Sequence, residues 1–154
     1  GPVVEPHRDA AVEDIPTAPG KTSLARGEFI TSFFLPSRPA NSADAYLRFI
    51  PRTEMDIAVV GCAVSLTLDA GGTITQARVS LGAVAPKVLL IQEAADAIIG
   101  TQLDDAALDA LATVASAAAK PIDDKRGTLA LRKDVSGVLA RRAAKIAYAR
   151  AKKG

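Results

Sequence analysis

Apolar and polar positions in the first half of the chain follow the short-period pattern that is typical of β-strands. Residues 28–35 form a run of aromatic and branched residues that ends at Pro36, and residues 45–50 form a shorter run that ends at Pro51. Proline has no N–H group to donate to a neighbouring strand. Each run is therefore predicted to be one strand that stops before its proline.

Two longer alternating runs, residues 58–68 and 73–84, are separated by the sequence Asp-Ala-Gly-Gly at residues 69–72. Glycine adopts the positive φ angles of tight hairpin turns at no steric cost. The two runs are therefore predicted to pair as an antiparallel hairpin. Residues 1–23, in contrast, are rich in proline, alanine and acidic residues and are expected to be an extended lead-in with little regular structure.

The apolar period changes to about 3.6 residues after Pro86, as expected for helices. Three helices are predicted, at residues 89–99 before Gly100, from a cap at Asp104 or Asp105 to residue 119, and from Gly127 or Thr128 to about residue 150. The expected apolar stripe of the second helix is Ala107, Leu108, Leu111, Val114, Ala115 and Ala118. The expected stripe of the third helix is Leu131, Val135, Val138, Leu139, Arg142 and Ile146.

Strands come first and helices follow, an order that predicts an α+β fold with the helices on one face of a small antiparallel sheet. The 154 residues are enough for one domain, which we place at residues 24–154, after the lead-in at residues 1–23. Gly1 and Pro2 are typical of the remnant left when a protease removes a purification tag. We therefore expect a neighbouring domain on the N-terminal side to be missing.

The composition is that of a globular protein, with 49% hydrophobic residues, 23% charged residues and a mean hydropathy of +0.18. Aromatic residues make up only 4%, so alanine, valine, leucine and isoleucine must build the core. The net charge of +2 is weaker than that of most nucleic-acid-binding domains. The longest apolar stretch is too short to span a bilayer. The single Cys62 cannot form an internal disulfide, which makes a reducing cytoplasm the expected compartment.

The sequence contains no phosphate-binding glycine loop and no GxSxG, HExxH or CxxC motif. His7 lies in the lead-in, where no partner would orient it as a base. Cys62 lies within a predicted strand and is expected to be a buried, unreactive thiol. The acidic pairs at residues 104–105 and 123–124 are better explained as helix caps or turns than as metal ligands. We therefore expect neither catalytic nor metal-binding residues in this chain.

Two polar regions leave alternatives open. Residues 46–56, with the sequence YLRFIPRTEMD, are either an edge strand and turn stabilised by ion pairs or a polar ledge that faces a ligand. The basic residues of the last helix favour a solvated face, with a protein interface second and nucleic acid third. These basic residues are Arg132, Lys133, Arg141, Arg142, Lys145, Arg150, Lys152 and Lys153.

Four stretches share their order and spacing with a known family. They are Arg48-Phe49 with Arg52 and MDIAVV at residues 55–60, then ARVSLGAVAP at residues 77–86, then PIDDKRGT at residues 121–128, then Arg132 with VLARR at residues 138–142. Together with Gly20-Lys21-Thr22 and Arg26-Gly27-Glu28, they cover about residues 14–148. In this order they resemble the C-terminal domain of the FAD-binding medium subunit of molybdenum hydroxylases, the carbon monoxide dehydrogenase and xanthine dehydrogenase family.

The resemblance implies a three- or four-stranded antiparallel sheet packed on three C-terminal helices. It also implies a parent oxidoreductase in which electrons pass from molybdenum through iron–sulfur clusters to FAD. The implied partners are the N-terminal FAD-binding domain of the same subunit, the molybdopterin large subunit and the iron–sulfur small subunit. Because that N-terminal domain would hold the phosphates and adenine of FAD, this chain alone is expected to bind no FAD and to catalyse no reaction.

Three cofactor-binding residues are implied by the same resemblance. Ile30 matches an apolar residue near the flavin ring, and Tyr46 matches an aromatic residue over the isoalloxazine. Arg48 matches a position usually held by lysine, where a cation near the polar edge of the ring favours the anionic reduced flavin. The alternative hypothesis is a stand-alone protein-interaction module that has kept the fold but no longer binds flavin.

Overall fold

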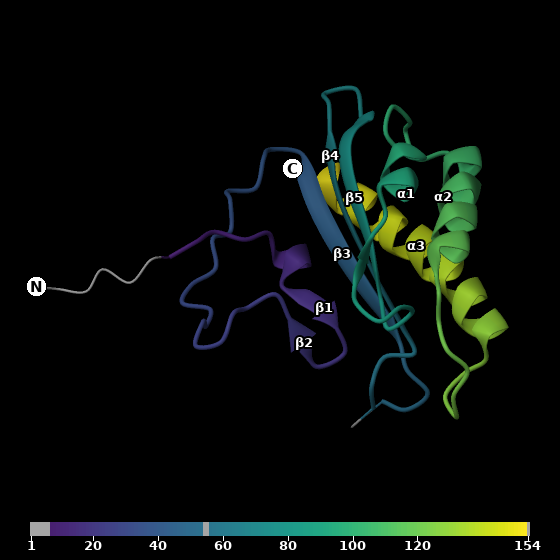
Figure 1. Cartoon of the computed structure of the whole chain (residues 1–154). Helices are drawn as coiled ribbons and strands as arrows, with labels where there is room; N and C mark the ends of the chain where they lie inside the picture. The colour runs from purple at the N-terminus through teal and green to yellow at the C-terminus, as the bar shows by residue number, and fades with distance from the viewer. Residues whose placement is uncertain (1–6, 54–55, 154) are drawn as a thin grey trace, which may run out of the picture.

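The computed structural model describes residues 7–53 and 56–153. The predicted tag remnant, Gly1 and Pro2, therefore lies outside the described residues. The elements in chain order are the 3-10 helix η1 (Val12–Asp14), β1 (Pro16–Ala18), β2 (Lys21–Thr22), β3 (Ser42–Phe49), β4 (Val60–Leu68), β5 (Ile74–Gly82), β6 (Leu89–Leu90), α1 (Gln92–Asp96), α2 (Asp105–Ala118) and α3 (Leu129–Ala151). Figure 1 shows their arrangement.

The main sheet has four antiparallel strands in the order β3-β4-β5-β6. Its central hairpin is the one predicted from the sequence. The carboxylate of Asp69 accepts hydrogen bonds from the N–H groups of Gly71 and Thr73, at 2.9 and 2.8 Å, and Gly72 has a φ of +86°. These contacts close the turn between β4 and β5 and thereby set the register of the two strands.

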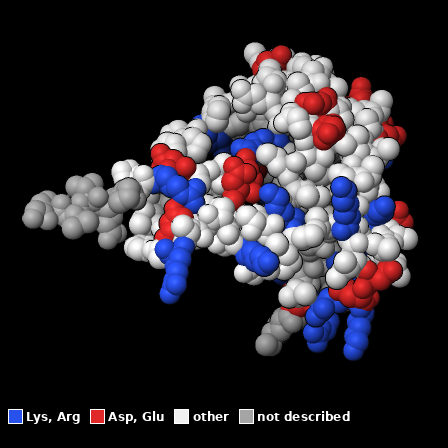
Figure 2. Space-filling view, in the orientation of Figure 1, with Lys and Arg blue, Asp and Glu red and all other residues white. Residues whose placement is uncertain are grey.

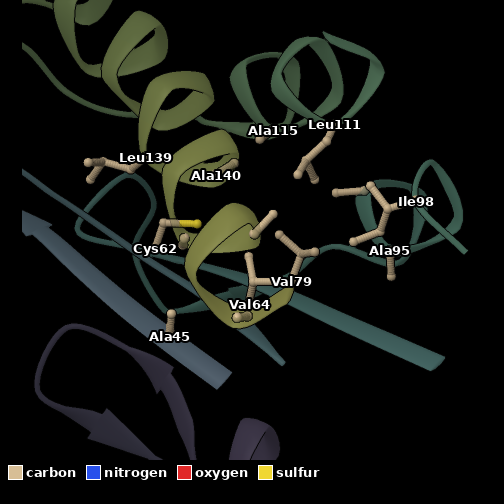
Figure 3. Close-up of a cluster of buried hydrophobic side chains, with 14 of the residues drawn as sticks. Ala45, Cys62, Val64, Val79, Ala95, Ile98, Leu111, Ala115, Leu139 and Ala140 are labelled. Atoms are coloured by element: carbon tan, nitrogen blue, oxygen red, sulfur yellow. The ribbon is translucent and has the colours of Figure 1, made fainter. Parts of the chain in front are cut away.

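The helices cover one face of this sheet, which confirms the predicted α+β fold (Figure 1). Helix α3 packs across β3 and β4, helix α1 packs on β5, and helix α2 packs on α3. Figure 3 shows the core between these layers, where Cys62 and Val64 of β4 and Val79 of β5 face Leu111 of α2 and Ala140 of α3. All five side chains are fully buried, so this face of the sheet belongs entirely to the core.

Side-chain caps begin the two longer helices. Asp104 accepts a hydrogen bond from the N–H of Ala107 at 2.8 Å, and Thr128 accepts one from the N–H of Leu131 at 3.2 Å. The predicted stripe of α2 is confirmed, since its members are buried or partly buried: Ala107, Leu108, Leu111, Val114, Ala115 and Ala118.

The predicted stripe of α3 is wrong in three positions. Leu131 is 41% exposed, Val138 is 44% exposed, and Arg142 is exposed. The buried stripe consists instead of small residues, with Leu139 as the one large apolar member and Arg132 as the one cation: Arg132, Ser136, Gly137, Leu139, Ala140, Ala143, Ala144, Ala147 and Ala151. A Cβ atom at Gly137 would lie 2.8 Å from the carbonyl oxygen of Ala112. Helices α2 and α3 approach so closely that large side chains are excluded from the contact.

Three other predictions need correction. Residues 28–35 form no strand, and the lead-in contains the small β1–β2 hairpin and η1. The helix predicted at residues 89–99 is divided into β6 and the five-residue α1, because the first residues pair with β5. None of the helices in residues 7–53 and 56–153 has the length and apolarity needed to cross a membrane.

Candidate functional site

The side of the sheet that the helices do not cover carries two of the three predicted cofactor-binding residues. Side chains alternate between the faces of a strand, so Ala43 and Ala45 of β3 enter the core while Tyr46 and Arg48 point the other way. Tyr46 is 61% exposed, and Arg48 is exposed. We call this side the open face, and in the region of Tyr46 it is formed by Tyr46, Arg48, Gly61, Ala63, Ser80, Gly82 and Leu90.

Small residues form the floor of the open face beside Tyr46. The register places Arg48 opposite Gly61 and Gly61 opposite Gly82, and it places Tyr46 in a row with Ala63 and Ser80. The ring of Tyr46 lies over Gly61, because a Cβ atom there would be 2.7 Å from the tyrosine Oη. A Cβ atom at Gly82 would have no atom within 4 Å. The sheet surface is therefore flat and accessible next to an aromatic ring and a cation.

The third predicted residue, Ile30, lies elsewhere in the chain. It is 44% exposed and belongs to the segment between β2 and β3 that has no regular structure. Together with η1 and the β1–β2 hairpin, this segment forms an arm, residues 7–41, on the side of the sheet away from α2 (Figure 1). The arm touches the open face through an ion pair of 3.0 Å between Glu13 and Arg78.

An ion-pair cluster fixes the loop that follows β3. The carboxylate of Asp56 lies 3.6 Å from Arg52 Nε and 3.4 Å from Arg126 Nε, and its side chain is only 3% exposed. It also accepts a hydrogen bond of 2.9 Å from the N–H of Ile57. Burial alone would raise the pKa of Asp56, but the Ile57 N–H and the two arginines outweigh it and lower the pKa. The carboxylate therefore stays ionised, and its ion pairs with Arg52 and Arg126 fix the loop after β3 next to the open face.

Arg132 connects the same loop to the rest of the domain. It is 4% exposed and donates hydrogen bonds to Val59 O at 2.7 Å and Ala83 O at 3.2 Å. Its guanidinium also lies 2.7 Å from the carboxylate of Asp124, and this contact, followed by the N–H of Arg126, lowers the pKa of Asp124. Arg132 thus brings together three of the sequence stretches on which the family resemblance is based, through Val59, Ala83 and Asp124.

Charged side chains gather where the loop after β3 meets the loop before α3. Figure 2 shows lysine and arginine side chains projecting at the lower end of the view, beside acidic ones, where the loop after β3 approaches the loop before α3. Among the described residues of the range 46–56, the ion-paired alternative is observed, while the ledge that faces a ligand stays a prediction. Arg52 and Asp56 form a turn with ion pairs, while Tyr46 and Arg48 face outward on the strand.

The other candidate groups have structural roles. Cys62 is fully buried, and burial raises the pKa of its thiol to about 12, so it is unreactive as predicted. Asp104 caps α2, and Asp123 accepts a hydrogen bond from the N–H of Leu129 at 2.5 Å. His7 is exposed at the start of the arm. Within residues 7–53 and 56–153, no group of three His, Cys, Asp or Glu side chains could hold a metal ion.

Three important residues were not identified from the sequence. Arg132 was counted among the cations of a solvated helix face, and only its position among small residues of the buried stripe distinguishes it. Gly61 and Gly82 lie within predicted strands, where glycine is disfavoured. A glycine in a strand often marks a surface that another group approaches closely, and that signal could have identified both.

Comparisons with known proteins place these features in a family. A family model described as CO dehydrogenase flavoprotein C-terminal domain matches residues 45–147. The chain is 37% identical to the carbon monoxide dehydrogenase medium chain of Afipia carboxidovorans, over 85% of this chain and 45% of that protein. It is 30% identical to the xanthine dehydrogenase FAD-binding subunit of Escherichia coli O157:H7, over 70% of this chain and 39% of that protein.

A solved structure gives the same result. The chain superposes on a chain of reconstituted CO dehydrogenase from Oligotropha carboxidovorans with a TM-score of 0.87 and 34% identity. The superposition covers 93% of this chain and 49% of that chain. This chain therefore spans about half the length of the curated relatives and of the solved protein that it matches.

Proposed function

The chain belongs to the CO dehydrogenase flavoprotein C-terminal domain family, and from this premise we propose that it forms one wall of the flavin site in the FAD-binding subunit of a molybdenum hydroxylase. The curated relatives are medium chains or FAD-binding subunits of oxidoreductases. The chain spans about half of their length, and we assign the rest of the flavin site to the part of the complete subunit that this chain does not include.

The observation that carries the proposal is the open face. Tyr46 and Arg48 project from the side of the sheet that lacks helices, above a floor in which Gly82 has free space over its Cα atom. Three strand spacings of about 4.8 Å separate β3 from β6, which gives a surface about 14 Å wide. A flat tricyclic ring system fits on such a surface, whereas larger side chains at Gly61 or Gly82 would obstruct it.

The residues of this face have distinct tasks toward the cofactor. Tyr46 provides an aromatic surface for the ring, and the exposed guanidinium of Arg48 provides hydrogen-bond donors and a permanent positive charge. Bound FAD supplies the two-electron redox chemistry of the complex. A cation beside its ring stabilises the anionic reduced form and so raises the reduction potential. Ile30 would contact the ring from the arm.

The remaining parts of the proposal concern the complex. The domain docks the molybdopterin large subunit and the iron–sulfur small subunit, so that electrons from molybdenum reach FAD through the iron–sulfur clusters. The name of one relative, carbon monoxide dehydrogenase medium chain, supports an enzyme built from more than one chain. We place the complex in the cytoplasm, in agreement with the free thiol of Cys62.

The test compares this chain with the complete subunit. The complete subunit is expected to purify yellow with bound FAD, and this chain alone is expected to retain none. Replacing Arg48 by alanine in the complete subunit should lower the flavin midpoint potential by about 20 mV, equivalent to about 1 kcal/mol for a two-electron couple. Arg48→Lys should restore most of the shift, and Arg142→Ala, on the exposed side of α3, should leave the potential unchanged.

Two results would contradict the proposal. A correctly folded complete subunit that is colourless and does not take up FAD would exclude the flavin site as a whole. A normal potential in Arg48→Ala, with full FAD content, would remove Arg48 from the site but leave the role of Tyr46 to be tested separately.

A further inference from the structure

The floor of the open face ends at one strand pair, in which Gly61 of β4 lies opposite Gly82 of β5. This is the last pair between the two strands, since β5 ends at Gly82. The ladder therefore stops beside Arg48, which lies opposite Gly61 on β3. The end of a ladder frays unless another group holds it, so the position of the two glycines depends on the contacts next to them.

Arg132 of α3 supplies the contacts that follow this last pair. Its Nη1 donates hydrogen bonds to the carbonyl oxygens of Val59 at 2.7 Å and Ala83 at 3.2 Å. Val59 lies directly before β4, and Ala83 lies directly after β5. One side-chain nitrogen thus joins the two strands at the point where their backbone ladder has ended.

The guanidinium of Arg132 is itself held from its other side. Its Nη2 lies 2.7 Å from the carboxylate of Asp124, which also accepts hydrogen bonds from the N–H groups of Arg126 at 2.8 Å and Gly127 at 3.2 Å. Arg132 is 4% exposed, and in the described part of the chain no buried side-chain nitrogen or oxygen lacks a hydrogen-bond partner. The donors of Arg132 therefore have fixed directions, as is required of a group that sets the position of other atoms.

Ala83 has a backbone conformation that needs such support. Its φ is +65°, in the left-handed region that is disfavoured for a residue with a Cβ atom. The residue is exposed, so burial of its methyl group does not hold it there. Its carbonyl is held by Arg132, and the next carbonyl, that of Val84, accepts a hydrogen bond of 2.8 Å from the N–H of Lys120. Strained residues persist only where their surroundings impose the conformation, and they are concentrated at functional sites.

We propose that Arg132 is a positioning residue for the flavin site. By holding the carbonyls of Val59 and Ala83, it keeps Ala83 in the left-handed conformation and so fixes Gly61 and Gly82 as a flat floor for the ring system. Arg132 acts through the backbone and does not touch the cofactor, because it belongs to the buried stripe of α3 on the helix side of the sheet. This inference rests on the proposed function, since it explains how the floor of that site keeps its shape.

FAD binding by the complete subunit, measured by flavin fluorescence titration, tests the proposal. Arg132→Met keeps most of the buried volume but removes the donors, so Ala83 should relax and FAD affinity should fall about tenfold. Glycine adopts a positive φ at no steric cost, so Ala83→Gly in the Arg132→Met background should restore most of the affinity. The same double variant should regain little of the lost melting temperature, because the carbonyl of Val59 still lacks its donor.

Leu111→Ala is the matched control. It removes a fully buried side chain of α2 and should lower the melting temperature without changing FAD affinity. If Arg132→Met does not fold, Arg132→Lys takes its place, since lysine keeps the charge but loses the planar fork of donors. Arg132→Lys is expected to lose about threefold in FAD affinity and to regain it with Ala83→Gly.

The outcomes separate this proposal from the flavin assignment. Wild-type FAD affinity in the folded Arg132 variant would overturn the positioning role and leave the proposed function intact. A loss of affinity that Ala83→Gly does not restore, or an equal loss in Leu111→Ala, would make the role of Arg132 purely structural and overturn the proposal as well. A folded wild-type subunit that takes up no FAD would contradict the proposed function and this proposal with it.

Discussion

The two faces of the four-stranded sheet are built from the same strands but have opposite properties. On the core face, Cys62, Val64 and Leu81 are fully buried beneath the helices. On the open face, the residues that alternate with them are small or polar, and Tyr46 is 61% exposed. One face therefore provides the folding energy, and the other is available for binding.

This difference teaches where to look for function in a domain without enzyme motifs. A sheet face that only needs to meet water would tolerate long polar side chains throughout. The open face instead has Gly61, Ala63 and Gly82 in its middle, next to a tyrosine and an arginine. Substitutions on the core face should change stability without changing flavin properties, and substitutions on the open face should do the reverse.

The largest expected effect is on the free energy of unfolding, when two adjacent residues of β5 that point to opposite faces of the sheet are each replaced by alanine. Leu81→Ala removes a fully buried side chain and should lower the free energy of unfolding by about 3 kcal/mol. Ser80→Ala, one residue earlier, should change it by less than about 0.5 kcal/mol. Urea unfolding of this chain measures both. Equal destabilisation by the two changes would contradict the assignment of the faces.

A comparable effect is expected at the buried cation of α3. Arg132→Ala leaves the carbonyl oxygens of Val59 and Ala83 without their donor and should lower the free energy of unfolding by about 3 kcal/mol. The matched change Arg142→Ala, at an exposed position of the same helix, should cost little. Urea unfolding measures the change in the free energy of unfolding for both variants. A neutral effect of Arg132→Ala would show that the loops are held by other contacts.

A smaller effect, confined to binding, is expected at Gly61. In the complete subunit, Gly61→Ala forces the ring of Tyr46 to move, because the new Cβ atom would lie 2.7 Å from Oη. FAD affinity should fall about tenfold, or about 1.4 kcal/mol. If the effect acts through the ring, Gly61→Ala should add almost nothing in a Tyr46→Ala background. Fully additive losses would mean that Gly61 acts on FAD independently of Tyr46.

The smallest expected effect is on the acid side of the stability profile. The pKa values of Asp56 and Asp124 lie below the ordinary value of 3.8 in the folded protein. The unfolded chain therefore takes up protons first, so stability is complete above about pH 4 and falls as the pH drops through the folded pKa values. Asp124→Asn should flatten this fall, while Asp105→Asn, at the exposed start of α2, should not. Melting temperatures measured from pH 6 to pH 2.5 for the wild type and both variants give the fall in stability of each.

Local signals in the sequence were sufficient for much of the fold. The Asp-Ala-Gly-Gly turn and the alternation around it predicted the β4–β5 hairpin. The start of α2 was predicted at Asp104 or Asp105, and Asp104 is the cap. These features depend on contacts within a few residues. The buried stripe of α3 was predicted only in part. Val135, Leu139 and Ile146 are buried or partly buried as predicted, but the close approach of α2 at Gly137 selects small residues over the larger ones that a periodicity argument favours.

The candidate site was predictable only in part for the same reason. Alternation along β3 places Tyr46 and Arg48 on one face without any knowledge of neighbouring strands. The floor could not be derived, because it requires the register that brings Gly61 and Gly82 together across two strand pairs. The arm failed as a strand, since a strand exists only with a partner and none of the described residues provides one for residues 29–35.

The fluorescence of bound flavin in the complete subunit, compared between the wild type and Tyr46→Leu, tests the central claim most directly. An aromatic ring in contact with the isoalloxazine quenches its emission by electron transfer, and leucine does not. The account predicts brighter flavin emission in Tyr46→Leu at equal FAD occupancy. Unchanged emission at equal occupancy would show that Tyr46 does not touch the ring and would contradict the role assigned to the open face.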